Sequence, residues 1–368
     1  MLKKRFSPLT LSISATLLIT SFCLTAPSYG QNNEPVLIAQ SNTRRLRELI
    51  RQGQEYVDAG RLEEAIYFYQ QASTLDNTDP KIYSGIGYLQ AQLGNFREAA
   101  NAYQQAVNLD SNNEDFYYAL GYSLANAGDD YGAANAYIRA SQIDPNNIQN
   151  YIALGTILYR QGDYNSAIDA YQRIINLDPN NRDAYDLMSQ ALIQQQRYPE
   201  AITLLERATR QFSRDGKLHL QLALALINQG DLNRGMSVLD TATRLDPNNA
   251  QIHLNVAKML HEQNNYEGAL SAYQRAVNLD SNSIDAQAGI GEIYLAQGEY
   301  LLAIITYRTL TELSPNHPGV YYNLGLALMG RNRTQEAKDA LQESLQLYRN
   351  EGNTQGARRA EELLRQIS

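Results

Sequence analysis

The side chains best suited to metal chemistry are three histidines and one carboxylate in the second half of the chain. His253 and His261 lie two helical turns apart, Glu262 follows, and His219 lies in an earlier copy of the repeat described below. Such a set could bind a metal weakly. The His-Glu pair also begins a zinc-protease motif, but residue 265 is Asn, so the second histidine ligand is missing. We favour a packing role, because His219 and His253 hold the repeat position of Tyr117, Tyr151 and Tyr185.

No other combination of residues indicates an enzyme. The stretches Gly85-Ile86-Gly87 and Gly289-Ile290-Gly291 fall inside predicted helices, where glycine serves close packing rather than phosphate binding. Cys23 is the only cysteine and lies near the N-terminus, in a segment expected to be removed. The mature chain would then have no disulfide, thiolate metal site or cysteine nucleophile. We therefore predict no catalytic residue, no metal and no cofactor.

Tyrosine is the residue type that points to binding. The chain has 26 Tyr and no Trp. A tyrosine offers a large contact area and a hydroxyl at little entropic cost, which suits protein recognition. The same residue also fills core positions. Which role applies depends on the elements that carry each ring.

A short turn sequence recurs along the chain. It reads Ile143-Asp144-Pro145-Asn146-Asn147 and returns as Leu177-Asp178-Pro179-Asn180-Asn181 and Leu245-Asp246-Pro247-Asn248-Asn249. Pro145 and Pro179 are 34 residues apart, and Pro247 follows at twice that spacing. Proline cannot continue a helix, so each copy is typical of a helix end. A fixed period of this size indicates a repeat architecture.

From Leu46 the chain divides into nine consecutive units of 34 residues, which cover 46–351. The eighth position of the unit is small, and the fifteenth is Gly or Asn in eight units, with Gln196 the exception. The twentieth is Ala in all but one unit, and the twenty-fourth is large, mostly Tyr. Positions 20 and 24 share one helix face. Each unit is therefore predicted to be helix A, a left-handed turn at position 15, helix B, and the Asp-Pro-Asn-Asn turn.

This pattern resembles the tetratricopeptide repeat family. One unit carries the family signature at eight positions: Tyr151, Leu154, Gly155, Leu158, Gly162, Ala167, Tyr171 and Pro179. The resemblance implies an all-α fold, a right-handed superhelical solenoid of nine helix pairs. Residues 352–368 remain, and Thr354 to Ile367 is predicted to form an amphipathic capping helix, which covers the last face of a solenoid.

The resemblance also implies where partners bind. In this family helix A lines a concave groove, and positions 2, 5, 9 and 12 of the unit face it. Positions 5, 9 and 12 are expected to face away from the packing of A against B. The predicted partner-binding residues are Tyr88, Asp115, Tyr118, Tyr122, Gln149, Ile152, Tyr159, Asp183 and Asp186. Groove positions in units five to eight also include Gln190, Leu220, Leu224, Lys258, His261, Asp285 and Glu292. The four tyrosines are expected to form one aromatic patch with Asp115 at its rim.

The N-terminal segment is predicted to be a secretory signal peptide. Lys3, Lys4 and Arg5 precede an apolar run, and Ser28-Tyr29-Gly30 offers a cleavage site before Gln31. An uncleaved membrane anchor is the alternative. Residues 31–45 are polar and are predicted to form a linker. Cleavage would leave 28 Lys and Arg against 39 Asp and Glu, a net charge of −11 that disfavours nucleic acid as a partner.

Two questions stay open at this level. The leading function is an exported scaffold that binds protein or peptide segments without catalysis, in the periplasm or outside the cell. The alternative is a periplasmic assembly factor that handles a metal such as Mn²⁺, because the leader and repeats also resemble the processing-associated repeat proteins of photosystem II assembly. Units five and six depart most from the repeat pattern, through neutral drift or as a softer joint.

Overall fold

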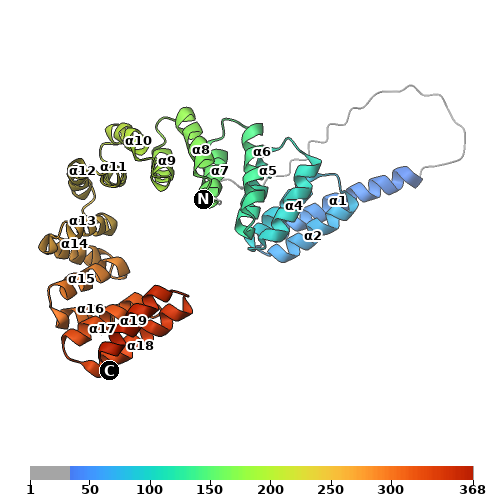
Figure 1. The fold of residues 1–368 in the computed structure, drawn as a ribbon. Coiled ribbons are helices and arrows are strands. Elements are labelled where there is room, and N and C mark those ends of the chain that lie inside the picture. The colour runs from blue at the N-terminus through green and yellow to red at the C-terminus, as the bar shows by residue number, and fades with distance from the viewer. Residues whose placement is uncertain (1–33, 368) are drawn as a thin grey trace, which may run out of the picture. The chain divides into compact units, whose positions relative to one another are not determined.

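The computed structural model describes residues 34–367, and within this range the regular structure is nineteen helices with no strand (Figure 1). The first six are α1 (Glu34–Asp58), α2 (Leu62–Leu75), α3 (Pro80–Gln92), α4 (Phe96–Leu109), α5 (Glu114–Ala127) and α6 (Asp130–Ile143). The next six are α7 (Ile148–Arg160), α8 (Tyr164–Leu177), α9 (Arg182–Gln194), α10 (Tyr198–Gln211), α11 (Gly216–Gln229) and α12 (Leu232–Leu245). The last seven are α13 (Ala250–Glu262), α14 (Tyr266–Leu279), α15 (Ile284–Ala296), α16 (Tyr300–Leu313), α17 (Pro318–Gly330), α18 (Thr334–Asn350) and α19 (Thr354–Gln366).

The helices follow the predicted order, with odd-numbered A helices and even-numbered B helices up to α18. The chain divides into two compact parts, one ending at Ile82 and one running from Tyr83 onward. The predicted signal peptide, 1–30, lies outside the described residues. The capping helix α19 begins at Thr354 as predicted, packs on α18, and buries Ala357 and Ala360.

The segment predicted as a polar linker is corrected by the structure. α1 begins at Glu34 and continues without a break into the first repeat, so residues 34–45 are helical. Between Pro35 and Gly53 the sequence contains neither Gly nor Pro. Proline is tolerated in the first turn of a helix, and nothing after it interrupts the backbone hydrogen bonds. The lack of an apolar period was therefore a poor guide to this segment.

The turn between A and B is left-handed at position 15 wherever the residue type predicted it. Gly128, Gly162 and Asn264 have φ of 88°, 80° and 60°. Gln196 holds the same position and also adopts a left-handed φ of 59°. Glutamine carries a Cβ that crowds this conformation, so the repeat geometry overrides the preference of the residue.

Small residues at position 8 let helix A approach the large residue at position 24 of helix B. A Cβ added to Gly155 would lie 2.5 Å from Cε1 of Tyr171, which is 1% exposed. Gly121 also lies close to its own Tyr137, where a Cβ would come within 2.9 Å of the ring. The close approach of A and B predicted from the small residues is therefore confirmed.

Apolar side chains form one long cluster in the middle of the chain and smaller ones after it. The long cluster runs from Ala133 on α6 to Leu226 on α11. Residues 220–259, 254–293 and 303–340 contribute to three further clusters. Among residues 34–367 no helix is long and apolar enough to cross a membrane.

Candidate functional site

The predicted groove tyrosines lie on A helices but lean onto B helices. The ring of Tyr118 on α5 meets that of Tyr137 on α6 edge-on, with centroids 5.5 Å apart. Tyr122 meets Phe96 on α4 at 6.1 Å. All three groove tyrosines from α5 and α7, Tyr159 included, are half-buried. A tyrosine side chain is long enough to place its ring on the neighbouring helix while keeping one edge in solvent.

This contact corrects one expectation. Positions 5, 9 and 12 were predicted to face away from the packing of A against B, and that is wrong for Tyr118, Tyr122 and Tyr159. Tyr159 at position 12 contacts Tyr164 on its own helix B, with ring centroids 5.1 Å apart. Tyr118 and Tyr159 both pack on the long apolar cluster. These rings therefore contribute to folding as well as to the surface.

Each groove tyrosine also neighbours the buried tyrosine at position 24 of its own unit. Burial, and then the nearby Tyr88, raises the pKa of Tyr103. Burial followed by Tyr118 and Tyr122 raises the pKa of Tyr137. In the next unit burial is again the main cause that raises the pKa of Tyr171, with Tyr159 close by. In each of units two to four a half-buried tyrosine therefore lies next to a buried one. That these tyrosines form one continuous patch across the units stays a prediction.

The remaining predicted residues of units three and four differ in exposure. Asp115 and Gln149 are exposed, as a rim position requires. Ile152 is partly buried against the long apolar cluster. Asn150, beside Gln149, is fully buried, and neither of its side-chain polar atoms has a hydrogen-bond partner among the described residues.

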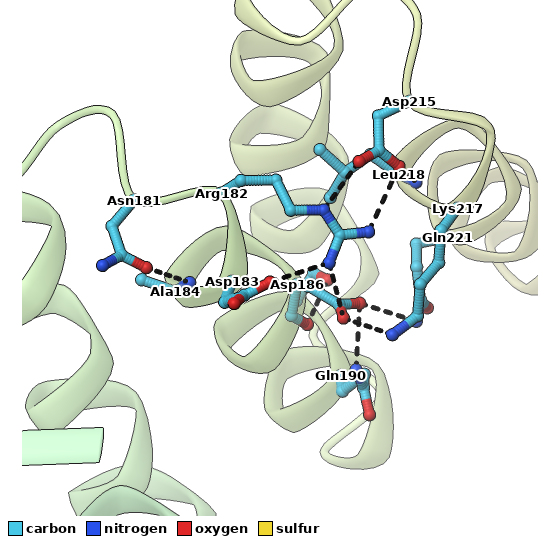
Figure 2. Close-up of polar contacts among 11 residues, drawn as sticks. Asn181, Arg182, Asp183, Ala184, Asp186, Gln190, Asp215, Lys217, Leu218 and Gln221 are labelled. Carbon is cyan, nitrogen blue, oxygen red and sulfur yellow. Dashed lines mark hydrogen bonds and ion pairs between the residues drawn. The ribbon is translucent and has the colours of Figure 1, made fainter. Parts of the chain in front are cut away.

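Units five and six hold a polar network centred on Asp186 (Figure 2). Asp186 on α9 is 4% exposed. Its carboxylate forms an ion pair with Lys217 Nζ at 2.5 Å and a longer one with Arg182 at 3.5 Å. It also accepts hydrogen bonds from the amide groups of Gln190 at 3.0 Å and Gln221 at 3.3 Å. Lys217 and Gln221 belong to α11, so the network joins two successive A helices.

Asp215, the N-cap residue of α11, extends the network. Its carboxylate accepts from Arg182 Nε at 2.6 Å and from the backbone N–H of Leu218 at 2.9 Å. Burial alone would raise the pKa of Asp215, but these donors outweigh it and lower the pKa below its ordinary value. Asp183, the other predicted residue, points to solvent with 76% of its side chain exposed and pairs with Arg182 at 3.0 Å.

Sequence reasoning missed the basic half of this network. Lys217 holds position 2 of unit six, so the rule that selected Asp183 in unit five would also have selected it. Arg182 and Gln221 lie at positions 1 and 6 and carry no such signal. The predicted site residue Asp186 lies on α9, but it is buried and its carboxylate is already bound by four side chains of this chain.

His253 takes the packing position that the tyrosines hold in other units. The Tyr151 hydroxyl donates to the carbonyl oxygen of Pro145 at 3.1 Å, and Tyr185 repeats the contact with Pro179 at 3.2 Å. His253 Nε2 lies 2.9 Å from the carbonyl of Pro247 and replaces the tyrosine hydroxyl in the same position of its unit. A carbonyl oxygen can only accept a hydrogen bond, so this contact requires the tautomer of His253 with the hydrogen on Nε2.

The acidic A-helix residues of units seven and eight have contacts within the chain. Lys258 pairs with Asp285 at 2.6 Å, and His261 rests against Tyr266 at a centroid distance of 5.6 Å. Burial, followed by the nearby acids Glu292, Asp285 and Glu262, raises the pKa of Tyr273 to about 12. Within the described residues no three His, Cys, Asp or Glu side chains are grouped to hold a metal.

Models of known protein families match most of the repeat region. The family model for the C-terminal domain of cilia and flagella-associated protein 70 matches residues 76–289. Two models of the tetratricopeptide repeat match 53–94 with 291–330, and 318–351. A TPR repeat-containing protein of Picosynechococcus sp. is 41% identical over 56 residues, which span 15% of this chain and 14% of that relative.

One of the similar solved structures supports the fold, and two further ones are similar over part of the chain. The C-terminal part of a TPR repeat-containing protein from Cytophaga hutchinsonii superposes with a TM-score of 0.53 at 16% identity, covering 66% of this chain and 99% of that one. A MamA protein gives a TM-score of 0.43 at 23% identity over 47% of this chain and 94% of its own. YrrB, described as a TPR protein with an unusual peptide-binding site, gives 0.40 at 21% identity over 51% and 96%.

These matches bear on the resemblance to the tetratricopeptide repeat family that the eight signature positions carry. The photosystem II resemblance stays a prediction. One matched model alone covers more than half of the residues, and repeat models account for the segment that follows it. The chain belongs to the tetratricopeptide repeat family.

Proposed function

We propose that this chain is an exported, non-catalytic scaffold that binds protein or peptide segments across its A helices, in a concave groove rich in tyrosine. The supporting observation is the set of aromatic contacts in units two to four. Tyr118, Tyr122 and Tyr159 are half-buried, and each rests on a ring of a B helix. A ring held from beneath loses little conformational entropy on binding, which favours recognition through rigid anchors.

The polar network of units five and six also supports a binding function, because it stabilises the arrangement of neighbouring A helices. It fixes α9 against α11 with side chains of the A-helix surface, and so holds that surface in one arrangement. Asp183 remains exposed there and Asp115 is exposed at the tyrosine end. A segment lying along the A helices would meet supported aromatic rings first and acidic side chains at the edges.

The experiment begins with selection of peptides from a random library against the full chain. A recovered peptide is then titrated, by fluorescence anisotropy, onto the double variant Tyr118→Phe with Tyr122→Phe. Phenylalanine keeps the ring contacts, so thermal stability should change little, whereas two lost hydroxyl contacts should weaken binding by about tenfold. Tyr131→Phe is the matched control, because Tyr131 belongs to the same unit but is 78% exposed on helix B.

Three results would contradict the proposal or move the site. Recovery of no peptide would reject the scaffold function. Equal binding by the double variant and wild type would exclude the tyrosines as anchors. Loss of binding on Asp285→Lys together with an unaffected tyrosine variant would place the site in units seven and eight.

A further inference from the structure

The outward face of α16 differs from that of every other B helix. Positions 18, 19 and 22 of unit eight are Leu301, Leu302 and Ile305, whereas the same positions elsewhere are polar or glycine, apart from Tyr67, Tyr131 and Pro199. The three aliphatic side chains are 54%, 41% and 56% exposed. They lie within one and a half turns of one helix, so they form a single apolar surface. Clustered exposed aliphatic residues are typical of interaction sites.

A groove begins one turn further along the same helix. It has a volume of about 420 Å³ and is lined by Arg308 on α16, Tyr321, Leu324 and Leu328 on α17, and the acidic side of α18. The acidic residues are Glu336, Asp339 and Glu343. Arg308 pairs with Glu336 at 2.7 Å and joins the two walls at one point. One base and three acids leave the lining with a net charge of −2.

We propose that the apolar face of α16 and the acidic groove beside it form a second docking surface, which binds an amphipathic helix with a basic flank from another protein. Apolar side chains of such a helix would cover Leu301, Leu302 and Ile305. Its Lys or Arg residues would meet Asp339 and Glu343 across the groove. Laying a helix between two helices is an established mode of peptide recognition, read as anchors at helical spacing.

The charge of the surface decides between occupants. A second copy of this chain would bring the same acidic α18 residues with it. A membrane with anionic lipids would be repelled by the groove acids rather than attracted. A basic amphipathic helix satisfies the apolar face and the acidic wall together. The surface is formed by α16, α17 and α18 of units eight and nine, whereas the tyrosine site lies on A helices of units two to four, so the two sites use different helices.

The probe is a labelled peptide of Leu, Lys and Ala, as long as α16 at 14 residues, with its leucines spaced to form one helical face. A scrambled peptide of equal composition is its control. Fluorescence anisotropy with the full chain should show binding of the patterned peptide only. The Ile305→Glu variant should bind it at least about tenfold more weakly, because a carboxylate then replaces the central anchor. Tyr131→Glu, the same kind of change at a more exposed position on α6, should bind as wild type does.

The electrostatic half of the proposal has its own variant. Asp339→Lys should weaken binding severalfold and flatten its dependence on salt, since an attraction becomes a repulsion. Glu267→Lys on α14, an exposed acid on the preceding B helix, is the control and should have little effect.

Several results would overturn the proposal. These are equal binding of the scrambled peptide, unchanged binding by Ile305→Glu, and no binding of the patterned peptide. Dimerisation of the full chain that Ile305→Glu abolishes, measured by sedimentation velocity, would assign the surface to a second copy instead. Binding to phosphatidylcholine or phosphatidylglycerol vesicles that Ile305→Glu abolishes would assign it to lipid. If the chain bound the patterned peptide but no peptide at the tyrosine site, only the proposed function would be contradicted. The two proposals can therefore fail separately.

Discussion

Two ion pairs join successive A helices, and they differ in their exposure to water. Lys217 reaches Asp186 between α11 and α9, and Lys258 reaches Asp285 between α13 and α15. The Asp186 side chain is 6% exposed and the Asp285 side chain is 63% exposed. The first carboxylate also accepts two amide hydrogen bonds. A buried, fully bonded carboxylate fixes the stacking of two units, whereas an exposed pair is screened and contributes little.

The buried ion pair bears on whether units five and six form a softer joint. Units five and six depart most from the repeat pattern, yet they share the long apolar cluster and hold the buried network. From Leu220 onward further apolar side chains form separate, smaller clusters. Departure from the pattern therefore coincides with added polar connections. The structure favours drift with compensation over a softer joint at these units.

The largest expected effect comes from removing the buried carboxylate. Asp186→Ala should lower the free energy of unfolding by about 2–3 kcal/mol, because Lys217, Gln190 and Gln221 lose their shared acceptor. Asp285→Ala is the matched control and should cost no more than about 0.5 kcal/mol. Urea denaturation followed by circular dichroism measures both. Equal losses of unfolding free energy in the two variants would contradict the expected difference between the buried and the exposed pair. An Asp186→Ala variant that stays stable but no longer binds selected peptides would show that Asp186 contacts the peptide.

A smaller effect, of opposite sign, is expected at Asn150. Position 3 of the A helices from α3 onward is otherwise apolar: Ile82, Phe116, Ala184, Leu218, Ile252, Ala286 and Val320. Leucine has the branched shape of asparagine, so Asn150→Leu should remove two unpartnered buried polar atoms without a clash. Stability should rise by about 1–2 kcal/mol.

The reverse change tests the same reasoning. Leu218→Asn places asparagine in the corresponding position of α11 and should cost stability, because Leu218 is fully buried. Both variants are compared with wild type by urea denaturation. A destabilised Asn150→Leu would mean that Asn150 binds a polar ligand or ordered water at this position. It would then join Tyr118 and Tyr159 as part of the candidate site.

Much of the fold could be predicted because each repeat position reports a local backbone requirement. Glycine or asparagine at position 15 predicts a left-handed turn, and Gly162 and Asn264 adopt it. A small residue at position 8 predicts the close approach that Gly155 makes to Tyr171. The helix through residues 34–45 was missed, because it depends on the absence of breakers rather than on an apolar period.

The candidate site was less predictable because it depends on contacts between side chains from different helices. Position 5 places Tyr118 on the expected helix, but the length of the side chain lets its ring reach Tyr137. Asp186 occupies the same position in its unit and is buried, since Lys217 reaches it from the next unit. Position within the repeat indicates the helix face. It does not indicate which neighbour covers a side chain.

The smallest predicted effect concerns the turn at Gln196. Eight of the nine residues at this position are Gly or Asn, and Gln196 alone carries a longer side chain in the left-handed conformation, with φ of 59°. That conformation costs a residue with a Cβ about 1–2 kcal/mol, and glycine avoids it while losing about 0.5–1 kcal/mol of chain entropy. Gln196→Gly should therefore stabilise the protein by about 0.5–1 kcal/mol. Gly162→Ala is the reciprocal control: a Cβ there meets no atom within 4 Å, so its expected loss is backbone strain alone. A Gln196→Gly variant less stable than wild type in urea would show that the glutamine side chain, rather than the backbone, holds this turn in the most divergent unit of the array.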